Sequence, residues 1–220
     1  MMINKLNAIY YKSASKNFEI LCISLLVDAY KSALKDKLFD VDWKENSFTK
    51  YLVSFIHTNP VTAKNKLFVK LQPEPENDNL PIEGTKDDPD RQPRIDIWYG
   101  SYGKTRNEYY IEAKNICNND WKKGNGSKVS ASKLKRRYII TGIENFVTGR
   151  YPKGCLVGYV INSNTVDCVN GINKLLKKDN RQNETLVKYT ILKGFENSFT
   201  STHSQKMETI LLKHIFLEFS

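Results

Sequence analysis

RIDIWYGSYGKTRNEYYIEAKNI, residues 94–116, is the stretch that decides the fold. Around residues 94–99, and again over residues 108–116, apolar side chains alternate with polar ones, which is the pattern of a β-strand. The residues between these runs, GSYGKTRN, are rich in turn formers. We therefore expect two strands joined as a hairpin with a longer loop.

Three charged residues of this hairpin are expected to meet at one edge of a sheet. Side chains two residues apart on a strand point to the same face, so Glu112 and Lys114 share one. Pairing across the hairpin would bring Asp96 to the same place. Mg²⁺ is commonly held by one or two carboxylates with water and substrate phosphate, and a bound metal lowers the pKa of its water. Two carboxylates and an amine are therefore a minimal set for hydrolysing a phosphodiester.

The same residues resemble a known motif. Asp96, followed on the next strand by Glu112-Ala113-Lys114, is similar to the PD-(D/E)xK motif of the restriction-endonuclease-like nucleases, with Ile95 where the motif has proline. The resemblance covers roughly residues 42–161. It implies an α/β fold whose restriction-endonuclease-like core is a mixed central β-sheet flanked by helices, here with extra C-terminal strands.

The resemblance also implies a role for each residue of the motif. Asp96 and Glu112 would hold Mg²⁺, or Mn²⁺ in its place, with the carbonyl of Ala113 as a further ligand. Lys114 would position or activate the attacking water. The alternative is that a Glu and a Lys two apart form only a solvated or cross-strand charge pair. Unpaired charge inside so apolar a strand is costly, which favours the functional interpretation.

A helix expected over residues 43–58 supplies one more carboxylate. Nucleases of the resembled family often carry a Glu on the helix before the core sheet, where it joins the metal cluster, and Glu45 is the matching residue. Asp42-Trp43-Lys44-Glu45 also has the form of a capping box. Capping and stabilisation of the helix dipole are therefore the alternative role of Glu45.

The charge of the chain is uneven. The formal net charge is +10, and residues 101–155 hold twelve Lys and Arg against four Asp and Glu, or +8. A concentrated positive charge suggests a polyanionic partner, although lysine-rich surfaces also serve solubility alone. Residues 73–96 hold eight acidic against three basic residues, or −5. Residues 73–93 are expected to form a loop that either overhangs the site or is an idle insertion.

DNA is the expected partner, with RNA not excluded. The basic, glycine-rich stretch after Lys114 and the basic helix over residues 129–148 lie beside the expected site, where they would suit phosphate positioning rather than only a solvated face. A polar loop over residues 199–205 adds one histidine, whereas His214 is expected to be packed. The candidate phosphate contacts are Lys122, Lys123, Lys133, Arg136, Arg137 and His203.

The other expected elements complete a single domain. We divide it into an N-terminal helix (1–40), a catalytic core (42–162) and a C-terminal extension of the sheet (163–220). The helices are expected over residues 13–37, capped by Ser13 or Ser15, and over 169–178. The strands are expected over residues 66–72, 154–162, 186–192 and 208–219, with helix as the alternative for the last.

The cysteines and the hydropathy pattern indicate the cellular compartment in which the protein is expected. The four cysteines have no zinc spacing and lie mostly in apolar runs, as buried free thiols do, so a reducing cytoplasmic setting is expected. The N-terminal apolar run is too short for a membrane span. The GxxxxGK[ST] pattern of a phosphate-binding loop is absent from the sequence, so translocation would require a partner ATPase or helicase. A homodimer would suit double-strand cutting.

Three functions are consistent with these patterns. The first is a metal-dependent endodeoxyribonuclease, to which the resemblance adds a role in bacterial restriction or antiviral defence. The second is a catalytically inactive nucleic-acid-binding subunit on the same fold. The third is an effector whose basic surface binds an acidic protein partner. The intact Asp96, Glu112 and Lys114 favour the first.

Overall fold

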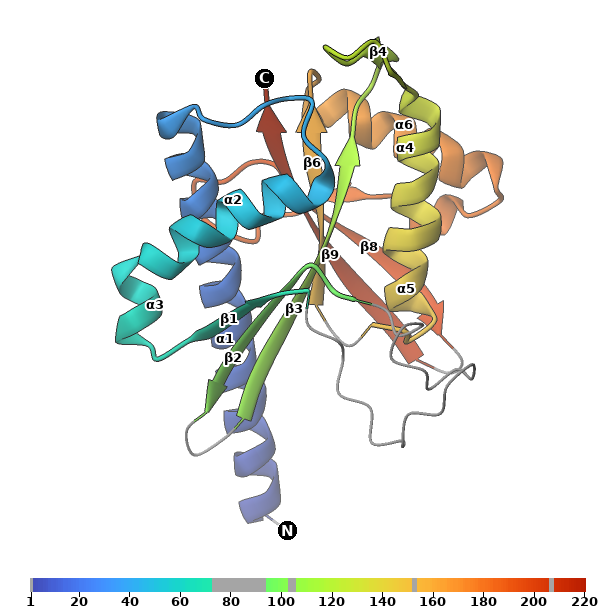
Figure 1. The fold of residues 1–220 in the computed structure, drawn as a ribbon. Helices are drawn as coiled ribbons and strands as arrows, with labels where there is room; N and C mark the ends of the chain where they lie inside the picture. Colours follow the sequence, from blue (N-terminus) through green and yellow to red (C-terminus); the bar gives the residue numbers. More distant parts are fainter. Residues whose placement is uncertain (1, 73–93, 103–105, 152–153, 206–207) are drawn as a thin grey trace, which may run out of the picture.

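The fold is centred on a mixed seven-stranded sheet, which confirms the predicted α/β class (Figure 1). The computed structural model describes residues 2–72, 94–102, 106–151, 154–205 and 208–220. Only the β3–β6 and β6–β9 pairs are parallel among these strands. In spatial order the strands are β1 (Phe68–Leu71), β2 (Ile97–Tyr102), β3 (Arg106–Ile116), β6 (Gly154–Ile161), β9 (Glu208–Phe219), β8 (Ser198–Gln205) and β7 (Val187–Lys188).

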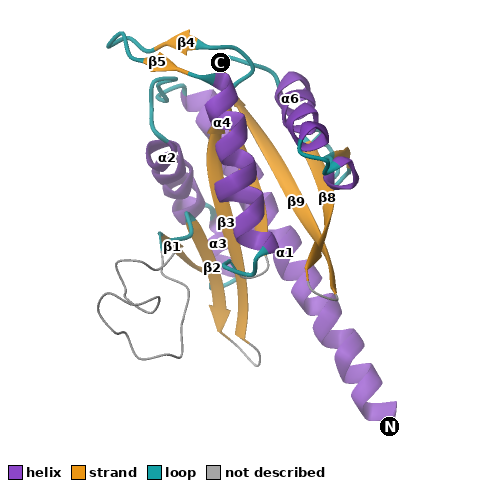
Figure 2. Cartoon of the chain, turned by 90° about the vertical axis from the view of Figure 1, so that its right-hand side faces the viewer, coloured by secondary structure: helices purple, strands orange, loops and turns teal. Residues whose placement is uncertain are grey.

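Helices cover both faces of the sheet. One face carries α1 (Met2–Asp36) and α2 (Glu45–Thr58), and the other carries the segment from α4 to α5 together with α6 (Thr165–Lys178) (Figures 1 and 2). The remaining elements are α3 (Pro60–Lys64), the two-stranded sheet of β4 (Trp121–Lys122) and β5 (Lys128–Val129), α4 (Ala131–Arg137), the π-helix η2 (Tyr138–Ile143), α5 (Glu144–Val147) and the 3₁₀-helix η3 (Gln182–Glu184).

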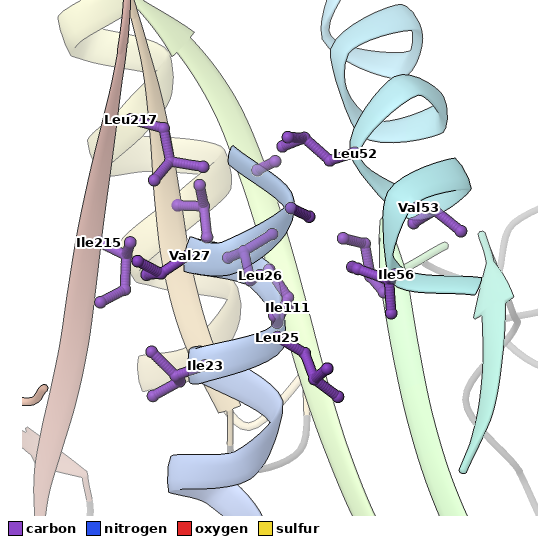
Figure 3. Close-up of a cluster of buried hydrophobic side chains, with 14 of the residues drawn as sticks. Ile23, Leu25, Leu26, Val27, Leu52, Val53, Ile56, Ile111, Ile215 and Leu217 are labelled. Atoms are coloured by element: carbon purple, nitrogen blue, oxygen red, sulfur yellow. The ribbon is translucent and has the colours of Figure 1, made fainter. Parts of the chain in front are cut away.

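Each face of the sheet encloses its own apolar core. Ile111 and Ala113 of β3 point to the α1–α2 side, where Leu26 and Leu52 pack against the sheet (Figure 3). Ile116 of β3 points to the α4–α6 side. The predicted alternation of β3 is therefore confirmed. Strand β6 is buried on both faces, as expected from its continuous apolar run.

The predicted helix over residues 129–148 is interrupted by a π-helical turn. In η2, the side chains of Tyr138, Ile139 and Ile143 are all buried against the sheet. Gly142 lies on the same side, and a Cβ atom added there would come within 2.9 Å of Leu156 Cδ2. The wider turn lets four residues of a six-residue segment face the sheet, and such π-turns are often found near functional sites.

Two predictions about helix starts are wrong. Helix α1 already begins at Met2, so Ser13 and Ser15 are inside it and cap nothing. Helix α2 begins at Glu45, and its N-cap residue Lys44 makes no side-chain cap hydrogen bond. Instead of capping α2, the Asp42 carboxylate accepts a hydrogen bond from the backbone N–H of Gly124, at 2.6 Å.

The C-terminal part of the chain also differs from expectation. Residues 199–205 were expected to form a loop but belong to strand β8. Its side chains alternate: Ser201 and His203 are buried and hydrogen-bonded, whereas Thr202 and Ser204 are exposed. The strand expected over residues 186–192 is only Val187–Lys188. The strand expected over residues 208–219 is confirmed as β9, which lies between β6 and β8 inside the sheet. The expected acidic loop, residues 73–93, lies outside the described residues.

All four cysteines are free and buried, as predicted. Among the helices that the structure describes, none combines the length and the apolar character needed to cross a membrane.

Gly158 is the residue of β6 that pairs with Lys114 of β3, and its lack of a side chain is needed there. A Cβ atom on this residue would lie 2.5 Å from Cδ1 of Phe216, which is fully buried. We expect Gly158→Ala to lower the free energy of unfolding by about 1–3 kcal/mol, the usual cost of overpacking. Urea unfolding measures this cost, with Thr202→Ala, an exposed change on β8, as the control. An unchanged midpoint for Gly158→Ala would show that the Phe216 ring moves aside freely.

Candidate active site

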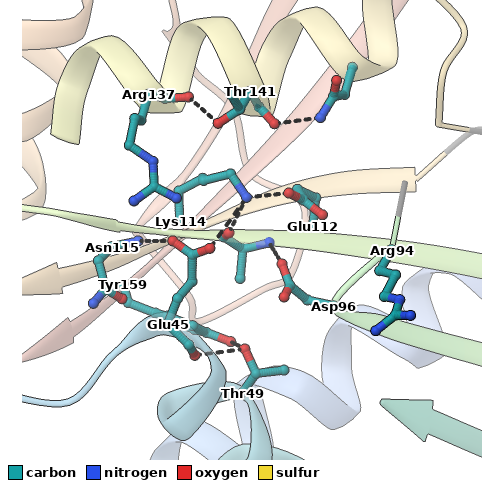
Figure 4. A network of polar contacts seen from close by, with 12 residues as sticks. Glu45, Thr49, Arg94, Asp96, Glu112, Lys114, Asn115, Arg137, Thr141 and Tyr159 are labelled. Carbon is teal, nitrogen blue, oxygen red and sulfur yellow. Dashed lines mark hydrogen bonds and ion pairs between the residues drawn. The ribbon is translucent and has the colours of Figure 1, made fainter. Parts of the chain in front are cut away.

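The candidate site lies where strand β2 separates from strand β3. The first half of β3 pairs with β2 up to the pair Ile97–Ile111, whereas residues 110–116 pair with β6. Beyond Ile111, backbone groups on the former β2 side of β3 have no partner among the strands that the structure describes. Because buried backbone groups must form hydrogen bonds, side chains fill these positions. Figure 4 shows that these are the side chains predicted from the sequence.

Asp96 takes the place of a strand partner at Ala113, the first backbone N–H on the β2 side of β3 beyond its pairing with β2. Its Oδ2 atom accepts a hydrogen bond from the backbone N–H of Ala113, at 2.7 Å. Its own carbonyl accepts the N–H of Gln72, at 3.0 Å. Continuing the β2–β3 register by one step puts Asp96 opposite Glu112, on one face of the sheet. The two carboxylates therefore lie on the same side of the sheet, as the sequence predicted.

Lys114 brings a positive charge between these acidic groups. Its ammonium donates hydrogen bonds to the Ala113 carbonyl, at 2.8 Å, and to Oε1 of Glu45, at 3.4 Å. It also forms an ion pair with Oε1 of Glu112. The ammonium thus lies among three oxygen atoms that come from β3 and α2.

Glu45 reaches the cluster from the start of α2. Its Oε2 atom accepts the backbone N–H of Asn115 at 3.0 Å, which ties α2 to the open edge of β3. The backbone carbonyl of Glu45 accepts a hydrogen bond from Thr49, whose hydroxyl also bonds Tyr159 of β6 at 2.9 Å. Both carboxylate oxygens of Glu45 bond residues of β3, so its side chain joins the cluster and does not cap α2. Its place in the first turn of α2 still favours stabilisation of the helix dipole.

Burial shifts the protonation of this cluster. Asp96, Glu112 and Lys114 are only 6%, 3% and 6% exposed. Burial raises the pKa of Asp96 to about 6. Burial and the neighbouring Asp96 charge raise the pKa of Glu112 to about 8. Burial alone would lower the pKa of Lys114, but the charges of Glu112, Glu45 and Asp96 outweigh it and the net shift is upward. Shifts of this kind are concentrated at functional sites.

The donor atoms of the cluster fit a hard divalent cation. Among the described residues, none forms a hydrogen bond of good geometry with the buried Oε2 of Glu112, which is rare for a buried carboxylate oxygen. Two carboxylates and a backbone carbonyl are the oxygen ligands that Mg²⁺ prefers. Within the described ranges, no three His, Cys, Asp or Glu side chains are grouped so that they could hold a metal ion. An ion here would therefore depend on Asp96, Glu112 and the Ala113 carbonyl, with water or substrate completing its shell.

Two residues of the site were not predicted. Asn115 follows Lys114 and donates from its side-chain amide to the Trp43 carbonyl, at 3.2 Å. Tyr151 donates to the Arg94 carbonyl at 3.4 Å, and burial, then the charges of Glu112 and Asp96, raise its pKa. No spacing rule links Tyr151 to the motif, because the polypeptide returns to the site only after α5. The only feature of the sequence that could have pointed to Tyr151 is its position just before the buried strand β6.

The predicted phosphate contacts do not lie together. Lys123, Lys133 and Arg137 line a hollow of about 530 Å³ that also includes Glu45 and Asn115. In Figure 4, the side chain of Arg137 extends from its helix toward the cluster. Lys122 is exposed on β4 and does not line the hollow. Arg136 turns away and pairs with Asp179 at the end of α6.

His203 is buried, so the prediction that it contacts phosphate is wrong. It is 1% exposed, and its two ring nitrogens bond Ser201 and Glu184, both at 2.6 Å. Ser201 also bonds Nε2 of His214 at 2.7 Å, and Nδ1 of His214 bonds the hydroxyl of Tyr138 at 2.9 Å. His214 is fully buried, as expected for a packed histidine. This chain of hydrogen bonds satisfies the buried side chains of Ser201 and His203 on β8 and of His214 on β9.

Comparison of the chain with protein-family models, with curated proteins and with solved structures finds no match. What the cluster of Asp96, Glu112, Lys114 and Glu45 can do therefore follows from its own chemistry.

Proposed function

We propose that the protein is a metal-dependent nuclease that hydrolyses phosphodiester bonds in DNA. The observation that carries this proposal is the buried convergence of Asp96, Glu112 and Lys114 around Ala113. Asp96 accepts the Ala113 N–H, and Lys114 bonds both the Ala113 carbonyl and the Glu112 carboxylate. A basic hollow adjoins this cluster through Glu45 and Asn115. Nuclease chemistry needs both parts, because a metal site cleaves only where a phosphate backbone can be held.

The cost of the cluster supports a function beyond folding. Several charged groups are removed from water here, and well-packed apolar side chains in place of a buried ion pair are often neutral or stabilising. A cluster kept only for stability is expected to satisfy its carboxylate oxygens, whereas no described residue forms a hydrogen bond of good geometry with Oε2 of Glu112. This oxygen can therefore act as a ligand to a cation, which supports a metal-binding role for the cluster.

Each residue has a distinct role in the proposed reaction. Asp96, Glu112 and the Ala113 carbonyl would hold Mg²⁺ or Mn²⁺, which when bound supplies charge stabilisation on the phosphate and lowers the pKa of a coordinated water. Lys114 hydrogen-bonds the attacking water and offsets negative charge on the phosphate. Glu45 holds the Lys114 ammonium at the edge of β3.

The finer assignments belong to the same proposal. The antiparallel β2–β3 hairpin followed by parallel β6 supports a restriction-endonuclease-like core. Buried free thiols support the cytoplasm as its location. A role in bacterial restriction or antiviral defence follows from the motif resemblance. A homodimer would suit cutting of both strands. Movement along DNA would require a partner ATPase or helicase, because the sequence has no GxxxxGK[ST] pattern.

The direct test is incubation of the protein with plasmid DNA, single-stranded DNA and RNA. We expect cleavage of DNA with Mg²⁺ or Mn²⁺ and none with EDTA. Salt-sensitive binding without cleavage under any divalent metal would instead identify a nucleic-acid-binding subunit. Failure to bind any nucleic acid at low salt would point to an effector with an acidic protein partner.

Glu45→Gln tests whether Glu45 belongs to the catalytic cluster. The amide oxygen can still accept the Asn115 N–H, so the link between α2 and β3 is kept, while the negative charge beside Lys114 is lost. We expect about a tenfold fall in kcat/KM, equivalent to about 1.4 kcal/mol of transition-state stabilisation. Steady-state cleavage assays measure this, with Glu196→Gln, an exposed change, as the control. Equal rates for wild type and Glu45→Gln would leave Glu45 a structural role only.

A further inference from the structure

The hollow beside the catalytic cluster has a shape and a lining that the proposed activity alone does not explain. It encloses about 530 Å³, within the range of pockets that surround a small organic ligand. Its walls come from the start of α2, the β4–β5 hairpin and α4. Its lining is basic and apolar: Trp43, Lys44, Glu45, Asn46, Asn115, Trp121, Lys123, Lys128, Val129, Ser130, Lys133, Leu134, Arg137 and Ile161.

The charges of the hollow are largely unneutralised. Lys44, Lys133 and Arg137 have no ion-pair partner within the described part of the chain. The one acidic residue of the lining, Glu45, is already engaged by Lys114 and by the backbone of Asn115. Unpaired cations around a concave space favour an anionic ligand, and phosphate groups fit this requirement.

The same space also offers aromatic and apolar surface. Trp43 and Trp121 line it, together with Leu134 and Ile161. A ligand that matches both the cationic and the aromatic lining combines a phosphate with a flat ring, which describes a nucleotide.

We propose that this hollow binds one unpaired nucleotide next to the phosphate that is cut, so that the preferred substrate is single-stranded or frayed at the cleavage point. This inference rests on the proposed nuclease function for the position of the cut, but not for the binding itself. A nucleotide of an intact duplex must first be unstacked and unpaired before it can enter such a pocket. An unpaired nucleotide enters without that cost and gains contacts with aromatic side chains.

The test measures binding without cleavage. Fluorescence anisotropy in EDTA at fixed salt compares a labelled single-stranded 12-mer with a blunt duplex of the same sequence. We expect the single strand to bind at least about tenfold tighter, equivalent to about 1.4 kcal/mol. Lys133→Glu with Arg137→Glu should weaken single-strand binding at least tenfold. Lys31→Glu is the matched control, because Lys31 is exposed on α1 and does not line the hollow.

A second variant separates the pocket from general charge attraction. Trp121→Leu keeps every charge but removes an aromatic ring on which a base can stack, so we expect it to reduce the preference for the single strand while leaving duplex affinity within about twofold. Circular dichroism and thermal melting check that each variant is folded. Equal wild-type affinity for the two DNA forms, or an unchanged preference in folded Trp121→Leu, would overturn the inference.

Cleavage assays with Mg²⁺ distinguish this inference from the proposed function. A single-strand preference that depends on Trp121, without cleavage of any DNA, would contradict the nuclease proposal and leave the nucleotide pocket standing. Equal cleavage of the blunt duplex and the single strand would contradict the pocket and leave the nuclease proposal standing.

Discussion

Lys114→Met is expected to lower kcat for DNA cleavage by about 10²–10⁴-fold, the contribution of one well-positioned acid–base or charged group. Methionine keeps an unbranched apolar side chain in the buried space but removes the ammonium that bonds Glu45, Glu112 and the Ala113 carbonyl. The attacking water then loses its positioning group, and the phosphate loses a positive charge. Single-turnover cleavage at saturating Mg²⁺ measures the chemical step.

Asp96→Asn complements this variant. The asparagine side-chain oxygen can still accept the Ala113 N–H, so the closure of the strand edge is preserved while the charge is lost. We expect a loss of cleavage similar to that of Lys114→Met. If Lys114→Met fails to fold, Asp96→Asn alone tests whether this cluster is the catalytic site. Lys177→Met, an exposed change at the end of α6, is the control and should cleave normally. Wild-type rates in folded Lys114→Met and Asp96→Asn would refute the assigned site.

Mg²⁺ affinity is expected to rise about tenfold per pH unit between pH 6 and pH 8, or about 100-fold over that range, because one proton leaves for each ion bound. The pKa of Glu112 is raised to about 8, so below that pH the metal-free protein holds a proton that the ion must displace. The pKa of Asp96 is raised to about 6, so below pH 6 a second proton is displaced and the slope doubles. Above pH 8 the affinity should become constant.

Isothermal titration calorimetry in buffers of different ionisation enthalpy counts the released protons directly. We expect about one proton per ion at pH 7 in the wild type. Glu112→Gln should bind Mg²⁺ more weakly and lose the dependence between pH 6 and pH 8. An affinity that stays constant from pH 6 to pH 8 in the wild type would show that Glu112 does not hold the ion.

The same carboxyl groups link protein stability to pH. The pKa of Glu112 is near its ordinary value of 4.5 in the unfolded chain, but burial and the neighbouring Asp96 charge raise it to about 8 in the folded protein. Because the folded state binds more protons between these values, this group makes the free energy of unfolding fall as pH rises from 4.5 to 8. Mg²⁺, which binds the ionised folded form, should raise Tm more at pH 8 than at pH 6.

Some features of the molecule could not be predicted because they depend on distant parts of the chain. The polar run of β8 is typical of a loop, but Ser201 and His203 are buried in the sheet by bonds to Glu184 and His214. Arg136 and Lys133 belong to one short helix and appear equivalent in sequence. Of the two, only Lys133 faces the hollow, because Asp179, directly after α6, pairs with Arg136. Helix packing, which no local pattern describes, separates the two.

Local periodicity by itself determined the two faces of β3. Residues two apart on a strand share a face, so the sequence alone places Glu112 and Lys114 side by side. For the same reason Ile111 and Ala113 face the apolar core on the other side of the sheet. Only the tertiary structure decided that these charges form a closed site. Because β2 separates from β3, backbone N–H groups of β3 are left for Asp96 and Glu45 to bind. The packing of α2 brings Glu45 to Lys114, which is 69 positions away in the sequence. Such contacts depend on how strands pair and helices pack over long separations, which the alternation of neighbouring residues does not encode.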